Sequence, residues 1–191
     1  MTADTPPRFR LVRTDRVHDG WAQFSVARYT LEDGTELVRE IEHHGDAIAV
    51  LPYDPARGTV FLVRQFRAPV AMASGAPEIL EACAGCLEPG EDAEACARRE
   101  LEEECGLTAR TMDRVATLWT IPGISTERVS YFLAEVDGSR RGRGGGLDAE
   151  HEFITVVEMP LAELAGPDRF RLLPDAKSQF LLDRLLDRLG R

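Results

Sequence analysis

Apolar and polar residues alternate along the first quarter of the chain in a way that predicts β-strands. The runs WAQFSVARYTL (21–31) and TELVREIEHH (35–44) are separated by Asp33-Gly34, a dipeptide typical of hairpin turns. A polar arm to about Thr14 precedes this hairpin. Apolar runs of strand length then follow at 46–53, 59–66, 78–83, 112–120, 127–136 and 153–158.

Two segments have the composition and periodicity of helices. Residues 92–105 lack Gly and Pro, are rich in Ala, Glu, Leu and Arg, and are bounded by Pro89-Gly90 and Gly106. Residues 175–189 carry an amphipathic apolar stripe that ends at Gly190. This stripe is too short to span a membrane, so we expect it to pack in the core.

Three carboxylates of the first predicted helix fall within a single turn. Glu100, Glu103 and Glu104 stand at positions i, i+3 and i+4, which places them on one face. Like charges at this spacing repel unless a cation binds, and carboxylate oxygens suit Mg²⁺ or Mn²⁺ rather than Zn²⁺. The alternative is an acidic face in contact only with solvent.

Residues 85–107 fit one spaced pattern, G-x5-E-x7-R-E-U-x-E-E-x-G-U, in which U is a bulky apolar residue. The matching positions are Gly85, Glu91, Arg99, Glu100, Leu101, Glu103, Glu104, Gly106 and Leu107. This pattern resembles the Nudix box. The resemblance implies a hydrolase acting on a nucleoside diphosphate linked to another group, with an α/β/α sandwich around a mixed β-sheet.

The segments around the box resemble a particular Nudix branch, the ADP-ribose pyrophosphatases. These segments are 49–55, 60–70, 79–85 and 121–136, the last with Pro122 sixteen residues after Gly106. The resemblance implies cleavage of ADP-ribose to AMP and ribose 5-phosphate. The stretches GGGLDAEHEFITVVEMP and LLPDAKSQFLLDRL also resemble enzymes that cleave GDP-mannose, so GDP-mannose and UDP-glucose remain alternatives. A non-catalytic Nudix sensor and a hydrolase of oxidised nucleoside triphosphates are two further alternatives.

The resemblance also implies roles for individual acids. The carbonyl of Ala84 and the side chains of Glu100, Glu104 and Glu152 look like ligands of Mg²⁺, with Mn²⁺ as the alternative ion. Glu103 is a ligand or its support, and Glu150 is the general base, with Glu152 as the alternative.

Two features of the residues bear on the same site. Arg99 is expected to orient one of these carboxylates as a fixed cation. Because residues 142–153 begin with a run of glycines, we expect a mobile loop that carries Glu150 and Glu152 over the substrate. A disordered connector is the alternative.

Four other residues resemble substrate-binding positions of the family. Arg67 matches the arginine that reaches the phosphates, and Glu81 matches a nearby acid. Arg39 and Glu42 match positions near the nucleobase, often contributed by a partner subunit.

Length and charge limit the remaining possibilities. The 191 residues suit one Nudix domain (46–191) preceded by an arm and hairpin (1–45) that we expect to form a homodimer and part of the substrate site. The net charge of −10 disfavours nucleic acid as a partner. Because no long apolar run or signal-like N-terminus is present, we expect a cytoplasmic protein that does not bind membranes.

Overall fold

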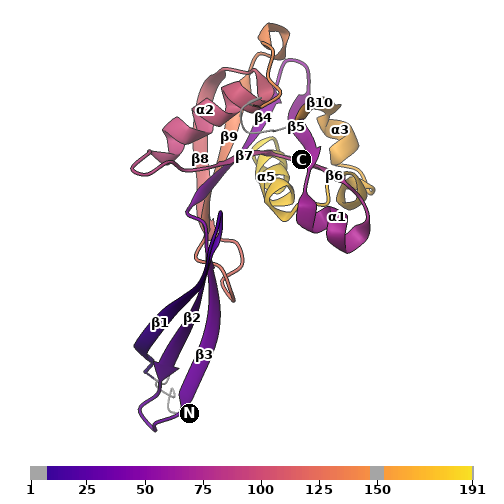
Figure 1. Cartoon of the computed structure of the whole chain (residues 1–191). Coiled ribbons are helices and arrows are strands. Elements are labelled where there is room, and N and C mark those ends of the chain that lie inside the picture. The colour runs from indigo at the N-terminus through magenta and orange to yellow at the C-terminus, as the bar shows by residue number, and fades with distance from the viewer. Residues whose placement is uncertain (1–7, 147–152, 191) are drawn as a thin grey trace, which may run out of the picture. The chain divides into compact units, whose positions relative to one another are not determined.

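The computed structural model describes residues 8–146 and 153–190. The chain divides into two compact units (Figure 1). Unit 1 comprises Met1–Asp46 and Trp119–Arg128, and unit 2 comprises Ala47–Leu118 and Val129–Arg191. Within the described residues, no helix is long and apolar enough to cross a membrane.

Unit 1 is built on a three-stranded antiparallel sheet in the order β1-β2-β3. The predicted hairpin forms β2 (Gln23–Thr30) and β3 (Glu36–His43). The end of the expected arm instead belongs to a strand, β1 (Arg10–Asp19), which pairs with β2. The sequence failed to indicate β1 because its side chains are almost all exposed, so no buried apolar face marks the strand.

The second segment of unit 1, residues 119–128, is joined to the sheet through β3. The Glu42 amide donates to the Ile124 carbonyl at 2.8 Å, and the Thr126 amide donates to the Glu42 carbonyl at 3.1 Å. The division at residue 45 expected from the sequence had placed this segment with the larger domain.

Unit 2 contains the mixed sheet, in the order β10-β5-β4-β9-β8, with β6 paired to β5 and β7 paired to β4. The central strand β4 is buried along its whole length and runs parallel to β9. The bounds are β4 (Ala47–Asp54), β5 (Thr59–Phe66), β6 (Glu78–Glu81), β7 (Cys83–Cys86), β8 (Ala109–Trp119), β9 (Arg128–Val136) and β10 (Thr155–Pro160).

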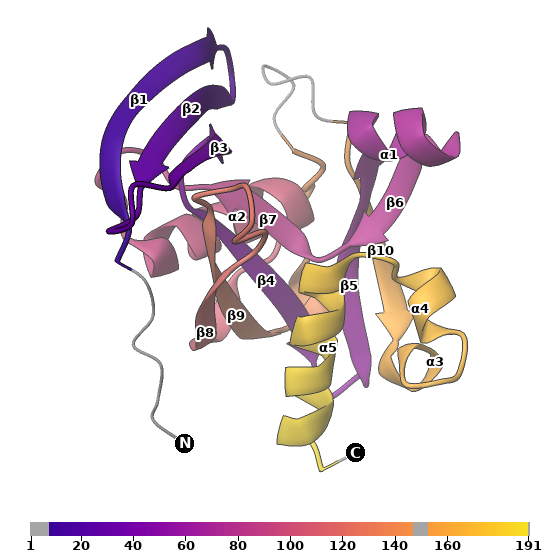
Figure 2. The ribbon, with the colours of Figure 1, turned by 90° about the horizontal axis from the view of Figure 1, so that it is seen from below.

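Two long helices cover opposite faces of this sheet. Successive residues of β4 alternate between two core clusters: Ala49 and Leu51 share one with α5 (Ala176–Arg188), whereas Ile48 and Val50 share the other with α2 (Ala93–Cys105). In Figure 2, α5 lies in front of β4 and β5. The predicted α/β/α sandwich is therefore confirmed.

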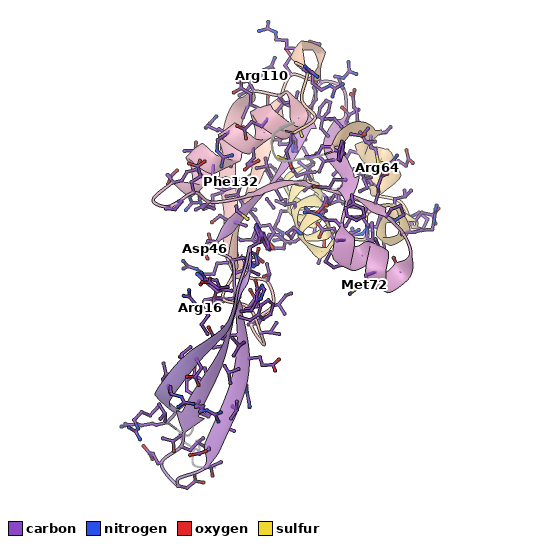
Figure 3. All side chains as sticks on the ribbon, in the orientation of Figure 1. Arg16, Asp46, Arg64, Met72, Arg110 and Phe132 are labelled. Carbon is purple, nitrogen blue, oxygen red and sulfur yellow. The ribbon has the colours of Figure 1, made fainter. Side chains whose placement is uncertain are left out.

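Shorter helices complete unit 2. They are α1 (Ala68–Ser74), η1 (Gly138–Arg140), α3 (Leu161–Leu164) and α4 (Arg169–Leu172). α1 was not anticipated from the sequence, because its segment APVAMAS is short and almost entirely apolar, with no helical periodicity of apolar and polar positions. Met72, labelled on α1 in Figure 3, is 88% exposed, whereas Phe132 of β9 is fully buried. Pro69 in the first turn and Gly75 as a left-handed cap were the available local signals.

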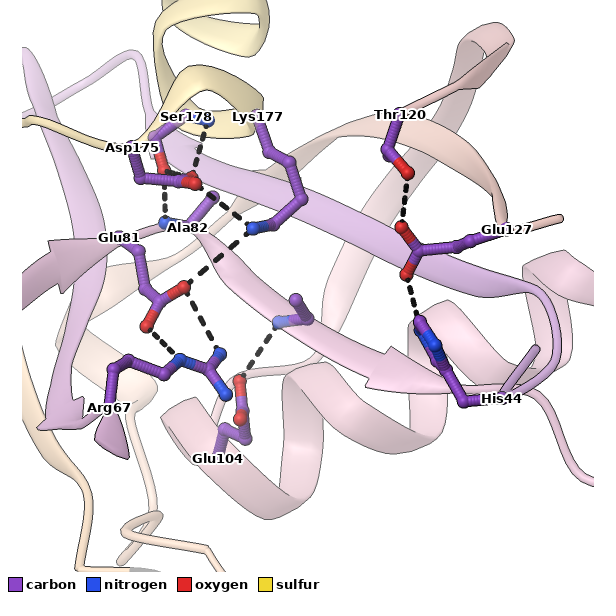
Figure 4. A network of polar contacts seen from close by, with 11 residues as sticks. His44, Arg67, Glu81, Ala82, Glu104, Thr120, Glu127, Asp175, Lys177 and Ser178 are labelled. Carbon is purple, nitrogen blue, oxygen red and sulfur yellow. Dashed lines mark hydrogen bonds and ion pairs between the residues drawn. The ribbon is translucent and has the colours of Figure 1, made fainter. Parts of the chain in front are cut away.

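The N-terminus of α5 is tied to the junction of β6 and β7. Asp175 caps the helix by accepting from the Ser178 amide at 2.9 Å and from the Ser178 hydroxyl at 2.6 Å. The Ser178 Oγ atom in turn accepts from the Ala82 amide at 2.6 Å, and Ser178 is fully buried (Figure 4). One side chain of α5 therefore fixes the backbone between the two strands.

We expect Ser178→Ala to lower the free energy of unfolding by about 1–3 kcal/mol, since the buried Ala82 amide would lose its acceptor. Denaturant unfolding measures this change. Ser74 also makes hydrogen bonds, but it is exposed, so Ser74→Ala should stay within about 0.5 kcal/mol of the parent protein. Equal losses in the two variants would contradict the assigned role of Ser178.

Candidate active site

The Nudix-like box occupies a strand, a loop and a helix on one face of the unit 2 sheet. Gly85 lies in β7, and Glu91 lies in the loop that leads to α2. Asp92 caps α2 by accepting from the amides of Glu94 and Ala95. Gly106 ends the helix with a left-handed φ of 66°.

Arg99 lies at the centre of the acidic residues of the box. Its Nε and Nη2 atoms each donate to one carboxylate oxygen of Glu91, both at 3.1 Å. Its Nη1 atom donates to Glu100 at 2.8 Å and to Glu103 at 3.0 Å. One guanidinium therefore orients three carboxylates and offsets part of their mutual repulsion.

The hydrogen bonds to Glu91 perturb both partners. Together with the Glu88 amide, which donates at 3.0 Å, the Arg99 guanidinium lowers the pKa of Glu91 to about 2. The pKa of Arg99 is raised, mainly by its hydrogen bond to Glu91. Glu91 thus fixes Arg99 to the loop at the start of the helix.

Gly85 leaves the space in which the Glu100 side chain lies. A Cβ atom at position 85 would be 2.1 Å from Oε1 and 2.2 Å from Cδ of Glu100. Any larger residue at position 85 would displace this carboxylate. The glycine of the box is therefore required by a close approach between strand and helix.

Glu104 is 1% exposed and lies against β7 on the buried side of the same helix. Its Oε2 atom accepts from the Ala84 amide at 3.2 Å. The amide and carbonyl of a strand residue point to the same side of the strand. The Ala84 carbonyl is therefore directed to the side of β7 on which Glu104 lies.

The chemistry of these groups suits a hard divalent cation, because every candidate ligand is an oxygen atom. However, within residues 8–146 and 153–190, no three His, Cys, Asp or Glu side chains converge on a single point in a metal-binding arrangement. Arg99 holds Glu100 and Glu103, and Ala84 engages Glu104. Binding an ion would require these carboxylates to turn from their present partners.

Arg67 and Glu81 form a second polar group in unit 2 (Figure 4). The Nε and Nη2 atoms of Arg67 donate to the two carboxylate oxygens of Glu81 at 2.7 and 3.1 Å. Burial alone would lower the pKa of Arg67, but Glu81 outweighs it and raises the pKa. Glu81 is 1% exposed, so it holds the partly exposed guanidinium of Arg67 in a fixed orientation.

The sequence analysis did not assign the residues of α5 that complete this group. Lys177 Nζ lies 2.9 Å from Asp175 and 3.9 Å from Glu81. Burial alone would raise the pKa of Asp175, but Lys177 and the hydrogen bonds from Ser178 outweigh it and lower the pKa. Asp175 directly before an apolar stripe was a recognisable helix cap, although nothing local indicated its link to Glu81.

The first part of the segment expected to be a mobile loop, residues 142–146, is hydrogen-bonded to α2. Three backbone amides of residues 142–146 donate to the C-terminal end of α2 and its cap, at 2.6 to 3.1 Å. The glycines there permit close contact between two backbones. From composition alone, such glycines look the same as those of a flexible loop. Glu150, His151 and Glu152 lie outside the described residues.

Arg39 and Glu42 belong to unit 1 and lie three positions apart on β3, so their side chains leave opposite faces of the strand. Arg39 lines a pocket of about 590 Å³ with Tyr29, Leu37 and residues 122–126. The structure therefore does not bring Arg39 and Glu42 together.

Glu42 is instead part of a cluster around His44, a residue to which no role was assigned from the sequence. His44 Nδ1 contacts Glu42, His44 Nε2 lies 3.0 Å from Glu127, and Trp21 stacks on the imidazole at 4.9 Å between ring centroids. Burial alone would lower the pKa of His44, but its hydrogen bonds to the two carboxylates outweigh it and raise the pKa. Because Glu127 is 83 residues from His44, no local pattern could have indicated this pair.

Comparison with known proteins identifies the family. A model of the NUDIX domain matches residues 43–180. The chain belongs to the Nudix family. Nudix hydrolases generally use divalent metal ions, in agreement with the oxygen ligands of the box.

Two relatives of this chain are named for different substrates. A GDP-mannose pyrophosphatase from Cronobacter sakazakii is 40% identical over 162 residues, covering 82% of each chain. An ADP-ribose pyrophosphatase from Bacillus subtilis is 37% identical over 155 residues, covering 81% of this chain and 80% of the relative. A crystal structure of an ADP compounds hydrolase is similar to this chain, with a TM-score of 0.75 and 20% sequence identity. The similarity covers 100% of this chain and of that hydrolase, and it shows the Nudix fold.

We expect Glu91→Gln to weaken the acid dependence of stability. The folded-state pKa of Glu91 is about 2 against an ordinary value of 4.5, so its contribution is present above pH 4.5 and disappears as the pH falls toward 2. Denaturant unfolding from pH 7 to pH 2.5 should show the variant less stable at pH 7, with the gap closing below pH 4.5.

Glu88→Gln is the matched control, since Glu88 lies in the same loop with an exposed side chain. It should follow the pH dependence of the parent protein. A gap between Glu91→Gln and the parent that stays constant at all pH values would contradict the pairing of Glu91 with Arg99.

Proposed function

We propose that the protein hydrolyses the pyrophosphate bond of a nucleotide sugar. Water attacks one phosphorus of the P–O–P bridge and yields a nucleoside monophosphate and a sugar phosphate. The observation that carries this proposal is the complete Nudix box, with Glu91, Glu100 and Glu103 arranged around Arg99 and Glu104 placed against β7. Because the box is intact, catalysis is favoured over a sensor that only binds.

We assign the metal site to the Ala84 carbonyl and to Glu100, Glu103, Glu104 and Glu152. Mg²⁺ is the proposed ion and Mn²⁺ the alternative, because both accept hard oxygen ligands. When bound, the ion neutralises charge on the phosphoryl oxygens. Arg99 holds Glu100 and Glu103 side by side, and both carboxylates would turn from its guanidinium to bind the ion.

Arg67 is the proposed phosphate-binding residue. Its guanidinium is partly exposed and is oriented by two hydrogen bonds to buried Glu81. A fixed, planar cation suits two phosphate oxygens better than a flexible one does. The general base is assigned to Glu150, which accepts the proton of the attacking water.

Two nucleotide sugars with different nucleobases are the candidate substrates. Unit 1 is the proposed binding region of the nucleobase. ADP-ribose is the first candidate, through the branch that the sequence resembles, and GDP-mannose is the second, favoured by the name of the relative from Cronobacter sakazakii. We further propose that the sheet of unit 1 forms a homodimer and that the protein acts in the cytoplasm.

A substrate panel tests the function directly. Release of nucleoside monophosphate would be measured from ADP-ribose, GDP-mannose, UDP-glucose and nucleoside triphosphates, each with Mg²⁺ and with a chelator. We expect Mg²⁺-dependent cleavage of ADP-ribose or GDP-mannose at least about tenfold faster than of the triphosphates, which corresponds to about 1.4 kcal/mol of transition-state binding. Binding without cleavage across the panel would reject hydrolysis in favour of a sensor.

Glu104→Gln tests the metal site. The glutamine oxygen can still accept from the Ala84 amide, so the fold should persist, whereas Mg²⁺-dependent turnover should fall roughly 100-fold or more. Steady-state kinetics and thermal unfolding would be measured together.

Glu102→Gln is the matched control, because Glu102 is an exposed acid on the same helix. It should retain turnover within about twofold, since its carboxylate lies outside the cluster. Full activity in Glu104→Gln, or equal losses in the two variants, would remove Glu104 from the assigned metal site.

A further inference from the structure

The glycine-rich segment of residues 142–146, here named the glycine strap, contacts the C-terminal end of α2. The Gly142 amide donates to the Gly106 carbonyl at 2.6 Å. The Gly145 amide donates to the Glu104 carbonyl at 2.7 Å, and the Gly146 amide donates to the Glu103 carbonyl at 3.1 Å. The strap thus binds the backbone of two residues whose side chains belong to the acidic box.

These hydrogen bonds complete the capping of α2. The last carbonyls of a helix have no partner within it and need donors from elsewhere. Gly106 and Leu107 supply amides to the Glu102 and Leu101 carbonyls at 2.9 and 3.3 Å. The strap supplies the donors for the Glu103 and Glu104 carbonyls, so each carbonyl of residues 101–104 accepts a hydrogen bond.

The contact is so close that it requires glycine on both sides. A Cβ atom at Gly144 would lie 2.7 Å from the Cys105 carbonyl carbon and 2.8 Å from the Glu104 carbonyl oxygen, and Gly144 has a φ of +55°. A Cβ atom at Gly106 would lie 2.7 Å from the Gly144 amide nitrogen. All of these are backbone atoms, which cannot swing aside as a side chain can.

Charge gives the strap a second effect. The C-terminal end of a helix carries partial negative charge, which opposes the nearby carboxylates of Glu103 and Glu104. Amides that point at this end offset that charge. They also hold the last turn in helical geometry, which fixes the positions from which both side chains project.

We propose that the glycine strap is a positioning element for the metal-binding carboxylates: it holds the last turn of α2 so that Glu103 and Glu104 are arranged for a divalent cation. This inference rests on the proposed function of the box. Gly144 is the position at which the strap is most sensitive, because its contacts involve backbone atoms alone. Loss of the strap lowers metal affinity, and the core cluster between the sheet and α5 contains no residue of the strap.

Gly144→Ala and Gly142→Ala form a matched pair for the test. They make the same chemical change two residues apart in one segment, but a Cβ atom at Gly142 would meet nothing closer than 3.4 Å and needs no left-handed φ. Affinity for Mg²⁺ and for Mn²⁺ alone, without substrate, would be measured by titration calorimetry. We expect Gly144→Ala to bind about tenfold more weakly and Gly142→Ala to stay within about twofold of the parent.

Amide hydrogen exchange of the parent protein gives a measurement that does not depend on a variant. The Gly145 and Gly146 amides should be protected, and Gly144→Ala should lose this protection together with that of the last turn of α2. If Gly144→Ala does not fold, protection of the two amides in the parent decides whether the strap is bound to the helix. Rapid exchange there would overturn the proposal.

The remaining outcomes also separate the strap from the function of the box. Unchanged metal affinity in Gly144→Ala, or an equal loss in Gly142→Ala, would overturn the positioning role. If the parent protein binds metal but cleaves no substrate, the proposed hydrolysis fails while the calorimetry still decides on the strap. Weakened metal binding only in Gly144→Ala, with protected amides in the parent, would support it.

Discussion

The fixed positive charge of Arg99 is the interaction on which the acidic box depends. Its guanidinium contacts three carboxylates, so the four groups together carry a charge of 1 − 3 = −2. Without the arginine, three negative charges would face one another across a loop and one helical turn. With it, the cluster is tolerable in the folded protein and still attracts a divalent cation. The same residue therefore serves stability and prepares the site for metal.

Space around α2 is limited as strictly as charge. Gly85 of β7 makes room for the Glu100 side chain of α2. Gly106 and Gly144 allow two backbones to come into contact at the C-terminal end of this helix. The helix is thus held at both ends and along its buried face, where Leu101 and Cys105 pack into the core. Carboxylates that must share one ion need such a rigid support, because small displacements change metal affinity.

Local signals in the sequence predicted the framework but not its long-range contacts. Pro89-Gly90 and Gly106 bounded α2, and Gly190 marked the end of α5, because turns and caps are encoded by neighbouring residues. By contrast, β1 lacks a buried face, and the Ser178 contact joins positions 96 residues apart. The box spacing placed Glu100, Glu103 and Glu104 on one helix, but their contacts needed the structure: the first two contact Arg99, and the third contacts the Ala84 amide. The close contacts of the glycines at 142–146 needed it too, since flexibility and close packing require the same residue.

Arg39 and Glu42, which were both proposed to contact the nucleobase, lie on opposite faces of β3. Their side chains leave opposite faces of the strand, so one subunit cannot present both to the same side of a base. Glu42 is already engaged by His44, which is itself held by Glu127 and stacked on Trp21. Within the described residues, the Arg39 side chain donates only to the neighbouring Val38 carbonyl, and it lines the pocket of unit 1. Arg39 is therefore the better placed of the two for direct contact with a ligand, and Glu42 acts by orienting His44.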